Sequence, residues 1–362
     1  MVMGRRPEVK TAPARVAAFA VAGLAAQLAT ALASVPFRRP LEGPAGRFHN
    51  VGTAVTRTVL RAFIGYTTSL PIQEFRSVEM LIDTICRVVL PPFLTRLGVT
   101  VRDIELGGVP VLDYRPTRVA PRGAILYLHG GGFIGTSPSM YAAFTGRIVH
   151  ETACRVFAPD YRLAPEFPYP ASLVDTISVY RAMLAAGLPA ERIFVAGDSG
   201  GGNLVTALVV EAIGRNLPRP AGLILFSPEL SLTLDEPSIT ENADRDILPW
   251  NIPVRPYLHG LAPRDERVSP VEADLHGFPP TFVAFGSDEM FRDPIRRFVG
   301  RLARSGVAPT AIEEPGMFHA FPLLMPWADA SGRVYRALGG FVRERLEAGA
   351  DEGTEADTVG EA

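Results

Sequence analysis

The sequence has little of what a disulfide-stabilised or nucleic-acid-binding protein needs. Among its 362 residues there are two cysteines, Cys86 and Cys154, and a lone pair does not make a disulfide scaffold. The formal net charge is −2, and no basic tract is long enough to bind nucleic acid, so we exclude that partner. Hydrophobic residues make up 47% of the chain. This composition fits a globular protein with a large core, either one large domain with a lid or two small domains.

Residues 1–50 form an N-terminal extension with two interpretations that the sequence leaves open. Four basic residues precede an uncharged run at 16–37, namely Arg5, Arg6, Lys10 and Arg15. With Ala31-Leu32-Ala33 as a cleavage site, the segment reads as a signal peptide. It also reads as an alanine-rich helix lying on the enzyme or on a membrane surface. A spanning helix is disfavoured, because alanine is only weakly apolar and Gln27 interrupts the run. The protein is exported or membrane-associated if the segment is a signal or an anchor, and otherwise cytoplasmic.

Residues 99–346 alternate between short apolar runs and helical patterns. Strands are expected at 101–106, 111–114, 124–128, 155–158, 193–196, 223–226, 281–285 and 310–312, the first two as a hairpin around Gly107-Gly108. Helices are expected at 139–153, 171–186, 203–213, 294–305 and 331–346. Continuous apolar strands alternating with helices predict an α/β fold with a mostly parallel central sheet covered by helices on both faces.

Three segments do not follow this alternation. Residues 51–98 read as two amphipathic helices, and residues 237–269 form a long connection rich in proline and polar residues. Connections of that length are commonly lids, so we assign both segments to a cap over the site. Residues 347–362 are acidic and free of aromatics, which predicts a solvated, disordered tail.

The glycine-rich segment Gly197-Asp198-Ser199-Gly200-Gly201 matches Gly-x-Ser-x-Gly, a strand-to-helix turn that exposes a serine oxygen. A phosphate-binding glycine turn is the alternative. It is disfavoured here, because no Gly-Lys-Thr continuation and no preceding Gly-x-Gly-x-x-Gly is present. Ser199 is therefore the candidate nucleophile.

A second glycine run lies upstream at His129-Gly130-Gly131-Gly132. Such a loop points backbone N–H groups at an oxyanion, and glycines allow close approach to a substrate. We expect the N–H groups of Gly131, Gly132 and Gly200 to bind the oxyanion, with His129 and Gly130 as part of the loop motif.

A serine nucleophile needs a base that is oriented by a third group. In the order serine, acid, histidine, the base is His319, which follows the last expected strand. The acid should end a strand between the two, and Asp288 comes first after the strand at 281–285. Glu289 and Asp293 are the nearby alternatives, and either could instead stabilise the start of the next helix. This chemistry needs no metal and no cofactor, and we expect none.

Several motifs together resemble one known family. They are HGGG at 129–132, DYRLAPE at 160–166, GDSGGGNL at 197–204, RVSP at 267–270, GSDE at 286–289 and GMFH at 316–319. In this order they resemble the hormone-sensitive lipase-like branch of the α/β-hydrolase fold, over about residues 99–346. The resemblance implies Ser199, Asp288 and His319 as a triad, an oxyanion loop at the glycine run and an N-terminal cap.

The chain departs from that family at two places. The family often has Ser-Pro-Trp-x-Asp-Leu-Thr after the strand that follows the nucleophile helix, whereas this chain has Glu229 in place of the tryptophan and Ser231 in place of the acid. The family's usual alanine after the serine is Gly200 here. Neither change touches the triad, but the first alters the shape of the pocket.

The expected function is a serine carboxylester hydrolase that cleaves short- to medium-chain acyl esters through an acyl-enzyme on Ser199. An amide hydrolase or an acyltransferase with the same triad is the alternative. A non-catalytic binding protein on a hydrolase scaffold is a more remote alternative, because all three expected triad residues are present. The expected partner is a small-molecule ester. Membrane contact through the N-terminal segment remains open, and the oligomeric state is not determined by the sequence.

Overall fold

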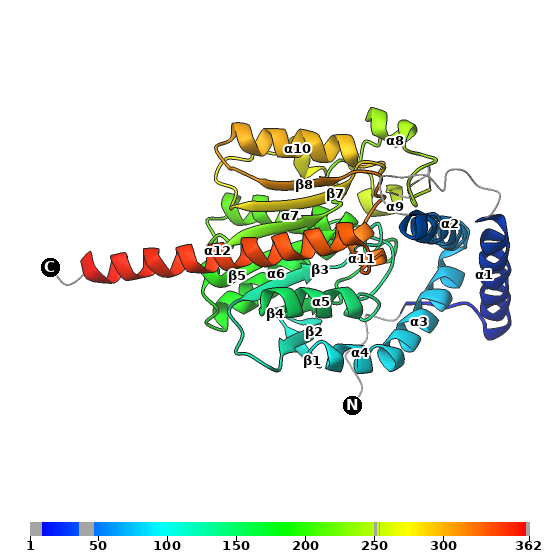
Figure 1. Cartoon of the computed structure of the whole chain (residues 1–362), viewed down its shortest axis with the longest axis horizontal. Helices are drawn as coiled ribbons and strands as arrows, with labels where there is room; N and C mark the ends of the chain where they lie inside the picture. The colour runs from blue at the N-terminus through cyan, green and yellow to red at the C-terminus, as the bar shows by residue number, and fades with distance from the viewer. Residues whose placement is uncertain (1–8, 36–46, 250–251, 253, 360–362) are drawn as a thin grey trace.

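The computed structural model describes residues 9–35, 47–249, 252 and 254–359 and has a single eight-stranded sheet in the order β1-β2-β4-β3-β5-β6-β7-β8 (Figure 1). Its strands are β1 (Val99–Leu106), β2 (Val109–Pro116), β3 (Ala124–Leu128), β4 (Arg155–Pro159), β5 (Ile193–Asp198), β6 (Gly222–Phe226), β7 (Thr281–Gly286) and β8 (Thr310–Glu314). β1 and β2 form the expected antiparallel hairpin, β2 pairs antiparallel with β4, and the remaining pairs are parallel. The mostly parallel sheet predicted from the sequence is confirmed.

Helices cover both faces of this sheet. One face packs against α5 (Ala142–Thr152) and α12 (Asp329–Val359), and the other against α6 (Ala171–Ala185), α7 (Ser199–Gly214) and α10 (Arg292–Arg304). Side chains along a strand alternate between the faces. In β3, Leu126 joins the core under α6 and α7, while Ile125 and Tyr127 join the core under α5 and α12. This is the two-residue period of a strand that is buried on both sides.

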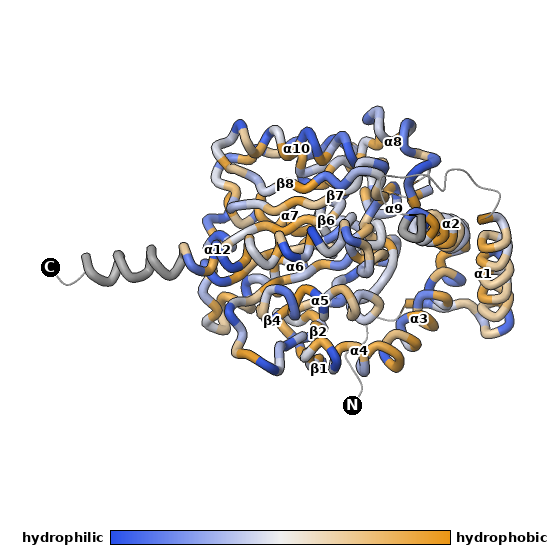
Figure 2. Tube along the Cα trace, in the orientation of Figure 1, coloured by the Kyte–Doolittle hydropathy of each residue, from blue (hydrophilic) through white to orange (hydrophobic). Residues whose placement is uncertain are grey.

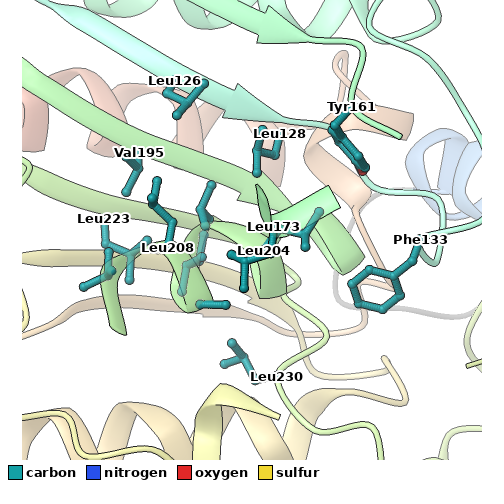
Figure 3. Close-up of a cluster of buried hydrophobic side chains, with 14 of the residues drawn as sticks. Leu126, Leu128, Phe133, Tyr161, Leu173, Val195, Leu204, Leu208, Leu223 and Leu230 are labelled. Carbon is teal, nitrogen blue, oxygen red and sulfur yellow. The ribbon is translucent and has the colours of Figure 1, made fainter. Parts of the chain in front are cut away.

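The core under α6 and α7 extends from the middle of the sheet to the edge where the parallel strands end. Figure 3 shows Leu126, Val195 and Leu208 in its interior, with Tyr161 and Phe133 toward the loops beyond the strand ends. Both aromatic side chains are buried. Phe133 belongs to the glycine loop that follows β3, so the loop is fixed to the core by a large apolar side chain.

The remaining helices lie beyond the carboxyl ends of the strands or beside the sheet (Figure 1). They are α1 (Ala14–Ser34), α2 (Arg47–Ser69), α3 (Ile72–Val89), α4 (Pro91–Arg96), α8 (Pro237–Glu241), α9 (Arg255–Leu258) and α11 (Phe321–Leu324), with short 3-10 turns at Ala190–Arg192 and Pro270–Glu272. The two helices expected in residues 51–98 are α2 and α3, and α4 follows them. α1 packs on α2 and α3 at the outer side of the molecule, and its surface is apolar along much of its length (Figure 2).

Residues 347–362 differ from expectation. α12 continues through this segment to Val359, where we expected a disordered tail, and Figure 1 shows it extending beyond the sheet. Extending an existing helix orders one residue for each hydrogen bond gained, whereas a new helix must first order several residues for its first hydrogen bond. The alanines and glutamates of this segment therefore continue α12. Residues 360–362 lie outside the described residues.

Close backbone approach fixes the position of α7. A side chain at Gly201 would collide with the carbonyl oxygens of Leu128, which ends β3, and of His129, which follows it. Gly214 belongs to the same helix, but a Cβ there would meet no atom within 4 Å.

We expect Gly201→Ala to destabilise the protein by about 1–3 kcal/mol, because it overpacks the contact between α7 and β3. Gly214→Ala, the matched control, should stabilise it by about 0.4–1 kcal/mol, because alanine restricts the unfolded chain more than glycine. Urea unfolding of the two variants measures both effects. A stabilisation by Gly201→Ala as large as that by Gly214→Ala would contradict close packing at Gly201, because both substitutions gain the same helix propensity.

Candidate active site

The nucleophile turn joins β5 to α7 without a loop between them. β5 ends at Asp198 and α7 begins at Ser199, whose φ of 50° lies in the left-handed region. A non-glycine residue rarely adopts this conformation, which is typical of the strained turn that exposes a nucleophilic serine. The turn requires a glycine before it, since a Cβ on Gly197 would lie 2.5 Å from the carbonyl carbon of Gly201.

The glycine run after β3 lies against this turn. Gly131 and Gly132 have φ values of 113° and 59°, which favour glycine. A Cβ on Gly200 would lie 3.5 Å from the backbone nitrogen of Gly132 and 3.2 Å from that of Phe133. The structure thus brings together the three glycines that the sequence nominated as oxyanion donors.

Asp198 connects the two glycine motifs, and no role was predicted for it from the sequence. Its Oδ1 accepts hydrogen bonds from the Gly130 N–H at 2.9 Å and from the Tyr127 hydroxyl, and its Oδ2 accepts one from the Tyr141 hydroxyl at 3.1 Å. Burial raises the pKa of Asp198 to about 6, although these donors act in the opposite direction. The carboxylate is therefore ionised at neutral pH and holds the oxyanion loop beside Ser199.

His129 supports the loop through its ring and its backbone. Its ring stacks on Tyr161 with 4.4 Å between the ring centroids, and its Nδ1 lies 2.8 Å from the hydroxyl oxygen of Thr136. The Tyr161 hydroxyl donates to the His129 carbonyl oxygen at 2.6 Å, and that of Thr136 donates to the Gly130 carbonyl oxygen, also at 2.6 Å. These contacts hold the loop's carbonyl groups in place.

His319 lies in the loop between β8 and α11, and its ring is oriented by a buried carboxylate. Its Nδ1 lies 3.2 Å from Oε2 of Glu289. Burial lowers the pKa of His319, while the carboxylates of Asp246 and Asp198 raise it in part. The imidazole is thus neutral at pH 7 and can accept a proton, as a general base must.

Glu289 is completely buried, and its other carboxylate oxygen, Oε1, accepts the Gly286 N–H at 2.9 Å. Burial raises its pKa to about 8, whereas the donors Ser227 and Gly286 lower it, and a proton on the adjacent His319 would favour the ionised form. The carboxylate is held by the end of β7 on one side and faces the histidine on the other.

Asp288, our expected acid, is not the carboxylate that contacts the histidine. Its Oδ2 faces the guanidinium of Arg57 on α2 at 3.4 Å, and its backbone N–H donates to the Met317 carbonyl oxygen. Successive residues in the turn after β7 point in different directions, so Asp288 is directed at the cap and Glu289 at His319. Counting residues from the strand end does not reveal that difference. The alternative Asp293 lies in the first turn of α10, where its carboxylate accepts the Ser238 N–H.

Asp246 is a further buried carboxylate that the sequence did not single out. Its Oδ1 accepts the His319 N–H at 2.9 Å, and its Oδ2 accepts the Met290 N–H at 2.7 Å. Nearby, the side-chain amide of Asn242 donates to the carbonyl oxygens of Ser287 and Glu289. The start of the long connection at 237–269 is therefore attached to the turn that contains Glu289 and to the loop that contains His319. The many polar residues of this connection were the sequence signal that could have indicated these contacts.

A cavity of about 310 Å³ lies beside these loops and is lined by Ser199, His319 and the oxyanion glycines Gly131 and Gly132. Most of its remaining wall is apolar and comes from the two segments that we assigned to the cap. α2 and α3 contribute Leu60, Phe63, Ile64, Phe75, Val78 and Ile82, and the connection contributes Ile247, Leu248, Pro249 and Ile252. A largely apolar cavity with few polar groups is the usual form of a small-molecule site.

Comparisons with known proteins find related hydrolases and esterases. The model of a family with the alpha/beta hydrolase fold matches residues 125–323. An acetyl-hydrolase of Streptomyces hygroscopicus is 32% identical over 252 residues, which cover 68% of this chain and 84% of that protein. An esterase of Acinetobacter venetianus is 32% identical over 277 residues, which cover 75% of this chain and 89% of that esterase.

Solved structures give the same result. The crystal structure of an esterase from the bacterial hormone-sensitive lipase family superposes with a TM-score of 0.72 at 28% identity, covering 80% of this chain and 98% of that one. A hormone-sensitive lipase homologue from a metagenome library has a TM-score of 0.66 at 33% identity, and the match covers 75% of this chain and 98% of that one.

The chain therefore belongs to the α/β-hydrolase fold family. Within that family it is a carboxylesterase-type hydrolase of the hormone-sensitive lipase-like branch, and it hydrolyses esters.

The two adjacent acids after β7 allow a matched test of the site. We expect Glu289→Gln to lower kcat by about 10³–10⁴-fold, because a neutral amide no longer stabilises the imidazolium or its tautomer. Asp288→Asn should change kcat by less than about threefold, because its carboxylate faces Arg57 of α2 and does not contact His319. Hydrolysis of p-nitrophenyl butyrate, with thermal melting of each variant as the control for folding, measures both. A larger loss in Asp288→Asn would restore our original assignment.

Proposed function

We propose that the enzyme cleaves short- to medium-chain acyl esters through a covalent acyl-enzyme on Ser199, with His319 as general base and Glu289 as the acid that orients it. One observation carries this proposal. Ser199 and His319 line the same apolar cavity, and a buried carboxylate lies behind the histidine ring on the side of Nδ1.

In the first half of the reaction, the Ser199 hydroxyl oxygen attacks the ester carbonyl carbon and its proton moves to Nε2 of His319, the ring nitrogen not engaged by Glu289. The carbonyl oxygen becomes an oxyanion that accepts the N–H groups of Gly131, Gly132 and Gly200. Each such donor contributes about 3–4 kcal/mol to lowering the barrier. The bond to the alcohol oxygen then breaks, and the alcohol leaves with the proton from His319.

In the second half, water takes the place of the alcohol. It transfers a proton to His319 as it attacks the acyl carbon, and the same three N–H groups receive the second oxyanion. The acid leaves, and the proton returns to Ser199. His319 therefore has to accept and release a proton in each half, which its neutral resting form and the adjacent carboxylate permit.

The cavity supports the chain length that we propose. Its volume of about 310 Å³ is at the lower end of the range of roughly 300–1,000 Å³ found for ligand pockets. Its wall includes Ile247 and Phe291, which leave apolar surface for an alkyl chain. A long acyl chain would not be enclosed in this volume.

We expect Ser199→Ala to lower kcat for p-nitrophenyl butyrate by about 10⁵–10⁶-fold, since loss of the nucleophile removes the entire covalent route. Ser178→Ala, whose hydroxyl bonds only its own helix at the Val174 carbonyl oxygen, is the matched control and should keep wild-type activity. In wild type, kcat/KM should be highest for butyrate or a near homologue among the acetate, butyrate, octanoate and palmitate esters.

Two results would contradict the proposal. Retention of activity in Ser199→Ala would exclude the acyl-enzyme on this serine, and a maximum at palmitate would exclude the proposed chain length. Adding a competing alcohol and analysing the products separates hydrolysis from transfer of the acyl group to an acceptor.

We also propose that the cap side of the enzyme contacts a lipid surface. Within the described residues, α1 is the one helix long and apolar enough to cross a membrane, with a mean hydropathy of 1.9, and only 11% of that window is buried. A signal sequence meets the same criteria of length and composition. Contact at a surface is favoured because α1 packs on the cap along one side, where Ala20 and Leu24 meet Val78 of α3.

The outer side of these helices is apolar and solvent-exposed. Phe19 is 78% exposed, and Val88 and Val89 of α3 are 72% and 61% exposed. Exposed apolar surface of this kind marks protein or membrane contact sites. Lys10 and Arg15 at the start of α1 are exposed as well, and basic residues next to an apolar helix favour anionic lipids.

The wild-type chain should float with vesicles of phosphatidylcholine and phosphatidylglycerol, and the triple variant Phe19→Gln, Val88→Gln, Val89→Gln should remain in solution. Val119→Gln removes an exposed valine elsewhere on the surface and should float like wild type. Wild type that stays in solution would contradict the proposal. So would a mature chain, measured by mass, that begins immediately after Ala33.

A further inference from the structure

Glu229 is a buried acid that the proposed mechanism does not use. It follows β6 at the carboxyl end of the strand, is 1% exposed and lines the cavity that contains Ser199. Its backbone N–H donates to the Ser199 carbonyl oxygen at 3.0 Å, so the residue is fixed next to the nucleophile. Among the described residues, its Oε1 has no hydrogen-bond partner.

The other acidic groups of the cavity wall are engaged. Asp198 accepts three hydrogen bonds within the oxyanion loop and its supports, and Glu79 pairs with Arg76 at 2.9 Å. Of the described residues that line the cavity, none is a lysine or an arginine. Glu229 thus brings a carboxyl group to an apolar wall without a cation to balance its charge.

The protonation state of Glu229 follows from this environment. Burial alone raises its pKa to about 8, so the side chain is a neutral acid at pH 7. Tyr257 of α9 is the nearby ionisable group that interacts with it, and burial raises the pKa of that phenol far enough to keep it neutral too. A neutral carboxyl group can both donate and accept a hydrogen bond.

Stability does not account for this residue. The side-chain amide of Asn203 donates to the carbonyl oxygens of Glu229 and Val268, both at 2.8 Å, and this anchors the backbone whatever the side chain. A buried polar group without a partner costs free energy that an apolar side chain of similar shape would not. A carboxyl oxygen held unpaired in a cavity beside a nucleophile is placed to meet a ligand.

We propose that Glu229 determines specificity by hydrogen-bonding a hydroxyl or carbonyl oxygen that the substrate carries near its ester group. The preferred substrates are then oxygenated esters, either of hydroxy- or oxo-acids or of alcohols with a second oxygen function. This inference rests on the proposed function of Ser199. It adds one polar contact to a cavity that otherwise selects for alkyl groups, and such a contact discriminates more strongly than an added methylene.

Two pairs of esters locate the contact. The acyl side is tested with p-nitrophenyl butyrate against p-nitrophenyl 3-hydroxybutyrate, and the alcohol side with propyl butyrate against 3-hydroxypropyl butyrate. Wild type should favour the hydroxylated member in one of the pairs by about tenfold or more in kcat/KM, the size expected for one hydrogen bond in a desolvated site. Glu229→Leu should bring that ratio to about one without slowing the plain ester. Glu229→Gln should keep part of the preference, because its amide still donates.

An equal ratio in wild type and Glu229→Leu for both pairs would overturn the inference. An equal loss of kcat/KM in Glu229→Leu on both esters of a pair, together with a lowered melting temperature, would also overturn it. That result would indicate that Glu229 has a structural role. So would a preference of wild type for amino-substituted over hydroxylated esters. Failure of the proposed function is recognised separately, by activity of Ser199→Ala on plain p-nitrophenyl butyrate.

Stability against pH checks the buried neutral acid without reference to catalysis. The folded pKa of about 8 lies above the ordinary value of 4.5, so folding takes up a proton between these pH values. Wild type should therefore lose stability relative to Glu229→Gln as the pH rises from 4.5 to 8, and the difference should level off above 8. A difference in melting temperature that does not change with pH would show that the carboxyl group is not buried and neutral.

Discussion

The left-handed backbone of Ser199 is the constraint on which the rest of the site depends. A serine at φ 50° between a strand and a helix leaves no room for side chains around it, and this accounts for the glycines at 197 and 201 and for the contact of α7 with the end of β3. The strain is maintained because the parallel sheet and α7 hold the turn from both sides. Asp198, the preceding residue, then uses its buried carboxylate to fix the oxyanion loop against the same turn.

The cap is joined to the catalytic loops by a few buried polar contacts. Asp246 accepts N–H groups from His319 and Met290, and Asn242 donates to the carbonyl oxygens of Ser287 and Glu289. Asp246 and Asn242 precede residues 247–252, which form part of the cavity wall. This segment of the cavity wall is therefore held by residues that contact the backbone of His319 and Glu289. A change in this segment is expected to alter both substrate fit and the position of His319.

Prediction from the sequence succeeded where periodicity and motif order carry the information. Continuous apolar strands, the hairpin around Gly107-Gly108 and the helices between the strands gave the fold, because a strand buried on both faces has no polar positions. The glycine motifs predicted the turn at Ser199 and the glycine loop beside it, because positive φ or close backbone approach at these positions requires glycine. The prediction for the residues after 346 differs from the structure, in which α12 continues to Val359. Composition suggests a disordered tail, whereas the growth of an established helix is cooperative.

The sequence by itself determined the sheet, the turn at Ser199 and the nomination of His319, since these follow from local patterns and chain order. Only the tertiary structure decided between two adjacent acids. Asp288 and Glu289 have the same charge and neighbouring positions, and the direction of each side chain depends on how the turn after β7 packs against the cap and the loop of His319. The same holds for Glu229, whose isolation in the cavity depends on residues from distant parts of the chain.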